Sequence, residues 1–337
     1  MTWLVWRQHR AEALAAALVL ALLAIAVTPT ALHLYQVTGQ IRQGGCLGRT
    51  PGAGCGSSID AFNATSRTLS GIVPVLNLLP GLAGAFIGAP LVAREIEDGT
   101  WQLAWSQGVT RRGWLRGQLL GALAVTVLSA ALFTALLTWW LSPVNYVNGR
   151  FTGNGFDFSG IIPLAWAVLA FAIGLLAGTV ARRVIPAMAV TLAGYAAIRL
   201  PVEFLLRPRY MPPARLWGIP FTASDPAPAG AWELGQGAVA PDGHTILTGD
   251  QFDQVQHTAA AALHPNPAAQ SDYLQALDQW LQAHGYTQVL TYQPASRFWL
   301  FQGIEAAICL GIALTATAVA CHLLLHRSRL SRGSALP

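Results

Sequence analysis

The stretch FSGIIPLAWAVLAFAIGLLAGTVA, from Phe158 to Ala181, contains no charged side chain. A helix needs about 20 apolar residues to cross a bilayer core of roughly 30 Å, so this stretch is long enough to span a membrane. Five further long apolar runs lie around it, at residues 13–35, 69–93, 119–141, 184–206 and 298–325, of which 184–206 is interrupted by Arg199 and Glu203 and 298–325 by Glu305. Six such runs in 337 residues leave too little polar chain to cover a soluble core. The sequence therefore predicts an all-α polytopic membrane protein with six transmembrane helices.

The composition agrees with this class and excludes several chemistries. Hydrophobic residues make up 53% of the chain and charged residues only 10%, whereas soluble domains carry about 25% charged residues. All 20 basic residues are Arg, so neither a P-loop lysine nor a Schiff-base lysine is available. The net charge of +5 is better explained by basic cytoplasmic loops than by nucleic-acid binding.

The N-terminal stretch and the arginine distribution predict the orientation. Trp3 and Trp6 stand beside Arg7 and Arg10, a pattern that favours an interfacial elbow helix over residues 2–12. The run 13–35 exceeds the apolar core of a signal peptide and lacks a cleavage site, so we expect it to be retained. With an inner N-terminus, segments 1–12, 94–116, 182–183 and 326–337 hold 11 Arg, and the short outer loops 36–68 and 142–160 hold four. Both termini are therefore expected to be cytoplasmic.

The inner loop 94–116 has an acidic start and a basic end. Gly99 is expected to end the second membrane helix, and Thr100 to cap a new short one. Trp101, Leu103 and Trp105 give that helix an apolar side, and the acidic lead-in consists of Glu95, Glu97 and Asp98. A connector resting on lipid is the simpler alternative, but anionic headgroups would repel those three acids.

The outer segment 207–297 is long enough for a small domain, and it separates residues 1–206 from the sixth helix and tail, 298–337. It begins with Pro-rich chain and continues with two helical stretches. The first, 250–263, is rich in Gln and Ala, and the second, 271–284, is amphipathic and ended by Gly285. Its histidines have no metal-ligand spacing, so no metal site is expected. The sequence also contains no GxxxxGK[ST], HExxH or GxSxG motif.

Three residue sets outside these segments suggest specific contacts. Cys46 and Cys55 share one outer loop, where oxidising conditions favour a disulfide. Arg199 and Glu305 each lie about seven residues, roughly 10 Å, below the outer ends of helices five and six, which predicts that they pair. Glu203, one turn from Arg199, is a rival partner, and a protonated Glu305 or one facing a wet cavity is the alternative. The small residues of the second helix form a face for close helix approach, either within the subunit or toward a dimer partner or transport path: Gly81, Gly84, Ala85, Gly88 and Ala89.

This layout resembles the permease subunit of ABC-2 type transporters. The stretch AREIEDGTWQLAWSQGVTRR, residues 93–112, is similar to the family's inner loop, in which E-x-G-T leads into a coupling helix. The opening TWLVWRQHR, residues 2–10, and YQPASRFW, residues 292–299, look like the actinobacterial branch.

The resemblance implies a non-enzymatic permease in a bacterial plasma membrane, most simply an exporter. It implies a dimer with a second copy or paralogue, and a separate ABC ATPase that binds ATP and Mg, so no cofactor is expected in this chain. The substrate is not implied. A membrane sensor or scaffold with an extracytoplasmic receptor domain is the alternative function. An intramembrane enzyme is a further one, for which only Arg199, Glu203 and Glu305 are candidate groups.

Overall fold

The computed structural model describes residues 2–47, 55–98, 111–151, 153–221, 223, 226–263 and 270–330. The chain divides into two compact units. The first unit contains residues 1–147, 153–207 and 299–337, and the second contains residues 148–152 and 208–298. Each unit is described separately below.

The first unit is helical, and the described part of the chain contains six helical segments long and apolar enough to cross a membrane, as predicted. Span two is assembled from consecutive helical pieces, and span five ends in two short ones. The spans are α1 (Thr2–Gln43); α2 (Cys55–Ile72), η1 (Val73–Asn77), α3 (Leu78–Ala83), η2 (Gly84–Gly88) and α4 (Ala89–Glu97); α6 (Arg111–Asn148); α8 (Ile162–Ala181); α9 (Val184–Pro201), η3 (Val202–Leu206) and η4 (Arg207–Arg209); and η5 (Ala295–Arg297) with α12 (Phe298–Leu330). The short α7 (Gly153–Asp157) precedes span four.

The N-terminal stretch 2–12, predicted as a separate elbow helix, is helical but belongs to the continuous helix α1. No break in the backbone hydrogen-bonding pattern separates it from span one. Aromatic and basic residues at a membrane surface require no such break, because a helix that crosses the interface exposes the same side chains to the headgroups.

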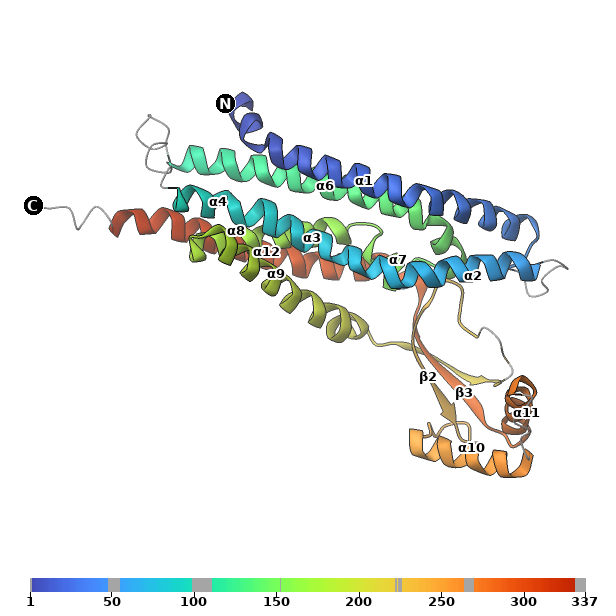
Figure 1. The fold of residues 1–337 in the computed structure, drawn as a ribbon. Coiled ribbons are helices and arrows are strands. Elements are labelled where there is room, and N and C mark those ends of the chain that lie inside the picture. The colour runs from blue at the N-terminus through green and yellow to red at the C-terminus, as the bar shows by residue number, and fades with distance from the viewer. Residues whose placement is uncertain are drawn as a thin grey trace, which may run out of the picture. The chain divides into compact units, whose positions relative to one another are not determined.

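Helices α1, α2 and α6 pack together through one apolar cluster that includes Leu34, Phe62 and Leu137. Two polar bonds join α1 to α6, which run side by side in Figure 1. The Trp140 indole N–H donates to Thr30 Oγ1 at 3.0 Å, and the Tyr35 hydroxyl donates to the Trp139 carbonyl at 3.0 Å. Since lipid offers no hydrogen-bond partners, such bonds help to fix the contact between the two helices.

Span two changes its helical form where prolines interrupt it. Pro74 lies in the first turn of the 3₁₀ segment η1, and Pro90 lies at the start of α4, directly after the π-helical turn η2. Proline removes a backbone N–H from the helix, and neighbouring turns adjust to satisfy the freed carbonyls. The span therefore stays helical throughout while its side chains shift around the axis.

The small-residue face of span two is buried against α8 and, at Gly81, against Tyr195 of α9 in the same chain. Its members Gly81, Gly84, Ala85, Gly88 and Ala89 are all buried. A Cβ at Gly84 would meet the backbone carbonyl of Ala170, and a Cβ at Gly88 would meet that of Phe171 at 2.6 Å. These glycines let the two backbones touch. The structure places this face inside the subunit, and not on a surface open to a second copy.

The second unit contains a three-stranded antiparallel sheet that sequence reasoning missed. Its strands are β1 (Ala214–Ile219), β2 (Trp232–Val239) and β3 (Thr287–Gln293), in the order β1-β3-β2. Leu216 and Gln236 both pair with Leu290 of the central strand. The side chain of Leu290 is fully buried. The two outer strands arise from a Pro- and Gly-rich stretch, a composition that is poor in strand signals.

The two helical stretches of the second unit form the expected helices, α10 (Gly249–Leu263) and α11 (Gln270–Ala283). They pack through Ala259, Leu277 and Leu281. After α11, Gly285 has a φ of +82°, and the N–H of Tyr286 donates to the Leu281 carbonyl. A left-handed residue of this kind closes a helix most easily when it is glycine.

We predict that Gly84→Ala destabilises the helix bundle, whereas Gly311→Ala does not. The new methyl group at Gly84 meets the Ala170 backbone, and such overpacking costs about 1–3 kcal/mol. Gly311 in α12 has no atom within 4 Å of the position of a Cβ, so alanine there keeps or raises stability through its better helix propensity. Thermal unfolding of the two variants in detergent measures the difference. Equal midpoints would show that α8 does not need a glycine at position 84.

Candidate functional site

A buried ionic cluster is the main polar feature of the first unit. It contains two arginines and two acids from three segments: Asp157 at the end of α7, Arg199 and Arg207 on span five, and Glu305 on α12. The side chains of Asp157 and Glu305 are 2% and 0% exposed, and those of Arg199 and Arg207 are 5% and 3% exposed. A charge that is left unpaired in a membrane helix costs about 2.5–3.5 kcal/mol or more. Strong mutual pairing is therefore required.

Arg207 makes the tightest contacts of the cluster. Its Nε and Nη2 donate to the two carboxylate oxygens of Glu305, each at 2.8 Å, and its Nη2 also donates to Asp157 Oδ1 at 2.7 Å. The guanidinium lies over the Phe156 ring, with Cζ 4.5 Å from the ring centroid. One side chain thus holds two acids that are 148 positions apart in the chain.

Arg199 completes the cluster from two turns earlier on span five. Its Nη2 lies 2.8 Å from Asp157 Oδ1, its Nε 3.2 Å from Glu203 Oε2, and its Nη1 3.5 Å from Glu305 Oε1. The guanidinium lies over the Trp166 ring at 4.7 Å, and the Trp166 N–H donates to Glu305 Oε1 at 2.9 Å. The predicted Arg199–Glu305 contact is therefore present, but it is the longest of the ion pairs that Arg199 makes.

Span two is tied to the same cluster through Asn77. Arg199 Nη2 donates to Asn77 Oδ1 at 3.2 Å, and the Asn77 amide donates to Asp157 Oδ2 at 3.3 Å. The Tyr195 hydroxyl donates to the Asn77 carbonyl at 2.8 Å. Segments from spans two, five and six and the α7 turn therefore meet at one point.

The spacing of span five explains how it delivers two arginines. Arg199, Glu203 and Arg207 follow each other at intervals of four residues, so they share one helix face. Pro201 stands inside this stretch, and the next five residues form the π-helical turn η3. A proline cannot donate its backbone hydrogen bond, and a π turn is one way in which a helix accommodates this.

Asp157 lies outside the spans and stays ionised. Burial alone would raise the pKa of its carboxyl group, but the guanidinium groups of Arg199 and Arg207 outweigh burial and hold that pKa below its ordinary value. The two arginines and the pair Asp157 and Glu305 balance in charge. Glu203, whose side chain is 26% exposed, is a third acid at the rim.

The opposite ends of the same helices are joined by Glu97. Its Oε2 accepts the backbone N–H of Val184, the first residue of α9, at 2.9 Å. This N–H has no partner within its own helix, so the carboxylate also interacts favourably with the positive end of the helix dipole. Glu95 is half-buried, and Asp98 is exposed at the end of α4. The remaining predicted coupling residues, Gly99, Thr100, Trp101, Leu103 and Trp105, lie outside the described residues.

The other predicted residue sets have clear places in the structure. Cys46 and Cys55 are joined by a disulfide between the end of α1 and the start of α2. Among the described residues, no group of three or more His, Cys, Asp or Glu side chains could hold a metal ion. Sequence reasoning missed Asp157, Arg207 and Asn77. The sequence feature that could have revealed them is their position, because each of these polar side chains stands within or beside an apolar run.

Six apolar helices and a buried ionic cluster define a multi-pass membrane protein. Residues 16–207, more than half of the 337, match the family described as ABC-2 membrane transporter related, and the chain belongs to this family. Members are typically non-catalytic permeases, and such transporters generally work with a separate ATPase. No curated protein and no solved structure matches the chain.

We predict that Arg207 couples to Glu305 more strongly than Arg199 does. Removing one partner of a buried pair costs about 3–5 kcal/mol, because the other charge is left uncompensated. In double-mutant cycles built from Arg207→Gln, Arg199→Gln and Glu305→Gln, the loss for the Arg207–Glu305 double variant should be far smaller than the sum of its single losses. The Arg199–Glu305 cycle should be closer to additive. Thermal stability in detergent is the measurement, and a larger coupling in the Arg199 cycle would contradict the geometry.

We predict that the purified chain has two free thiols, those of Cys309 and Cys321, and one disulfide. Closing this short loop stabilises the fold by about 2–3 kcal/mol in the chain-entropy picture. The Cys46→Ser/Cys55→Ser variant should therefore unfold at a lower temperature, and a reducing agent should destabilise the wild type but not the variant. Thiol counting by mass spectrometry under non-reducing conditions gives four reactive thiols if the disulfide is absent.

Proposed function

We propose that this chain is the membrane-spanning permease subunit of an ABC-2 type exporter in a bacterial plasma membrane, with both termini cytoplasmic. A separate ABC ATPase would bind ATP and Mg, and a second copy or a paralogue would complete the transport path. The stretches 2–10 and 292–299 are the residues on which we also propose the actinobacterial branch of the family. The observation that carries the proposal is the Glu97–Val184 bond in a chain of this family.

This bond connects the helix that leads into the proposed coupling segment, residues 99–110, to span five. Residues 99–110 connect α4 to α6, and the bond ties the last turn of α4 to the first residue of α9. A push from an ATPase on that segment would therefore act on spans two and five together. Asp98 is the exposed acid nearest to the segment and a suitable contact for a basic surface.

Close packing would carry the displacement along the helices. Ala89 and Ala93 of α4 pack with Ala177 of α8 and Ala187 of α9, and all four are buried. Small side chains bring the backbones close together, and close-packed interiors deform little, so the helices move as one body. Spans two, four and five would form the moving block.

The ionic cluster would hold the other end of the block. Arg207 directly precedes Pro208, where the long segment of the second unit begins. The chain returns to the first unit at Gly153 and at Trp299, and Asp157 and Glu305 follow these two points within a few residues. Opening a path there requires that Arg207 release an acid or move with both. We infer that the ion pairs of the cluster hold the outer end of the transport path closed.

The two other functions receive less support. The buried acids Asp157 and Glu305 are each engaged by arginine, so the cluster offers no free acid or base for an intramembrane reaction. A sensor or scaffold would use the second unit as a receptor, and it would need no ATPase partner. Co-purification with an ATPase therefore distinguishes it from a transporter.

We predict that the tagged chain, extracted gently from native membranes, brings an ABC ATPase with it and shows ATP hydrolysis that the chain alone lacks. The Asp98→Arg/Trp101→Ala variant should lose the ATPase, because its docking charge and aromatic surface are gone. Glu97 is left intact, since replacing it would also remove the bond to Val184. The control is Asp60→Arg, which reverses an exposed acid on α2.

Loss of the ATPase from the variant alone, with normal amounts of the membrane protein, supports docking at residues 98–105. Retention of the ATPase by the variant would contradict docking there. If even the wild type brings no ATPase, or if the isolated chain hydrolyses ATP, the permease assignment is wrong.

A further inference from the structure

The charges of the second unit are strongly polarised along its sequence. Its arginines are Arg150, Arg209, Arg215 and Arg297, and residues 216–296 between the last two contain no Arg or Lys. The same 216–296 stretch holds all seven acids of the unit: Asp225, Glu233, Asp242, Asp250, Asp253, Asp272 and Asp278.

Three of the four arginines stand where the chain leaves or enters a membrane helix. Arg150 follows the end of α6 by two residues, Arg209 is the last residue of span five, and Arg297 directly precedes Phe298, the first residue of α12. Covalent connection alone therefore keeps these three at the ends of the spans. Such a position does not depend on which side of the membrane the second unit occupies.

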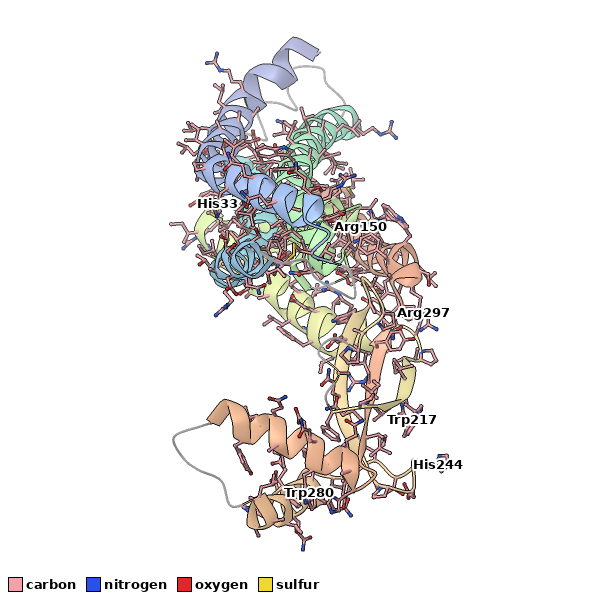
Figure 2. The ribbon with its side chains drawn as sticks, turned by 90° about the vertical axis from the view of Figure 1, so that its right-hand side faces the viewer. His33, Arg150, Trp217, His244, Trp280 and Arg297 are labelled. Carbon is pink, nitrogen blue, oxygen red and sulfur yellow. A yellow bond between two sulfur atoms is a disulfide. The ribbon has the colours of Figure 1, made fainter. Side chains whose placement is uncertain are left out.

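The four arginines are called here the arginine root, and contacts within the second unit tie two of them, Arg150 and Arg297, to neighbouring parts of the chain. The Arg150 guanidinium lies 5.2 Å from the centroid of the Phe298 ring, beside Arg297 in the chain. Arg297 Nη1 donates to the Pro212 carbonyl at 2.7 Å, and Arg209 and Arg215 each lie three residues from Pro212. Figure 2 shows Arg150 and Arg297 toward one end of this unit, and His244 and Trp280 toward the other.

The four arginines of the root differ in their contacts and in their exposure. Arg297 also donates to Gln293 Oε1 at 2.7 Å, so it holds the end of β3 and the chain before β1 together. Arg150, Arg209 and Arg215 are exposed. The nearest acid in the strands is Glu233 on β2, opposite Tyr292, and it leaves the arginine root positive overall.

We propose that the arginine root binds the phosphate groups of anionic phospholipids, which seats the second unit on the membrane by its base. The planar guanidinium matches phosphate oxygens in a bidentate way. An anionic bilayer also attracts basic residues next to its surface, while it repels the acidic remainder of the unit. Both effects favour one orientation, with the start of β1 and the span ends toward lipid and α10 and α11 away from it.

The test uses the full chain in nanodiscs, made either of phosphatidylcholine alone or of equal parts phosphatidylcholine and phosphatidylglycerol. Hydrogen–deuterium exchange of peptides covering residues 208–219 reports on the root locally, and peptides from α10 and α11 report on the remainder of the unit. Each engaged arginine adds about a fivefold factor in affinity. We expect slower exchange at 208–219 with phosphatidylglycerol, and no lipid-dependent change in α10 and α11.

The decisive variant is Arg150→Gln/Arg209→Gln/Arg215→Gln, which leaves Arg297 and its strand contacts in place. It should lose the protection by phosphatidylglycerol, in line with a combined affinity loss on the order of a hundredfold. The matched control, Arg42→Gln/Arg67→Gln/Arg94→Gln, removes three exposed arginines elsewhere and should keep the protection. Native exchange in β2 and α11 of both variants shows that the unit is folded.

Three results would overturn the proposal. One is equal exchange at 208–219 in both lipid compositions. Another is that the root variant keeps full protection by phosphatidylglycerol, or that the control variant loses this protection to the same degree. The last is protection by inorganic phosphate added to phosphatidylcholine nanodiscs to the same degree, which would mean a site for free anions and not for a lipid surface. None of these results bears on the ATPase partner, so they are separate from the test of the transporter assignment.

Discussion

The Arg207–Glu305 pair is the constraint on which the bundle depends. A carboxylate with no exposed surface inside a membrane helix is stable only if strong donors surround it, and Arg207 supplies two of them. Because Arg207 also holds Asp157, one side chain links span five to α12 and to the turn before span four. Any change in the spacing of these segments must either break the contacts of Arg207 with Glu305 and Asp157 or move all three residues together.

The ionic cluster and the Glu97–Val184 bond lie at opposite ends of one packed block. Span two contributes Asn77 to the first and Glu97 to the second, 20 residues apart, and its small-residue face packs on α8 between them. Helices α1, α2 and α6 pack through a separate apolar cluster. The bundle therefore contains a block braced by polar contacts and a separate apolar layer. Under the proposed function, the block would be the part that transmits force along the helices.

The spans were predictable because their signal is composition over about 20 residues, which needs no knowledge of the fold. Depth below the surface also led to the Arg199–Glu305 pair, but it did not lead to Arg207, which contacts Glu305 more closely. Arg207 was counted as a loop boundary, and the π-helical turn that follows Pro201 was not foreseeable from spacing. The sheet was missed because β1 lies among prolines and β2 carries two glycines, so its pairing with the distant β3 leaves a weak local signal. Whether the small-residue face packs within the subunit could not be decided either, since its partner α8 is remote in sequence.

The absence of lysine gives the arginines two roles, which burial separates. In the cluster a guanidinium bridges two acids through Nε and Nη2, a geometry that a single ammonium group cannot match while keeping each contact linear. Guanidinium is also more weakly hydrated than an ammonium group, which suits it to buried ion pairs. At the arginine root three of the four guanidinium groups are exposed, and the acids of the unit lie in residues 216–296. The buried arginines thus join segments of the chain to each other, whereas the exposed ones are the groups that we propose to bind a phosphate-bearing surface.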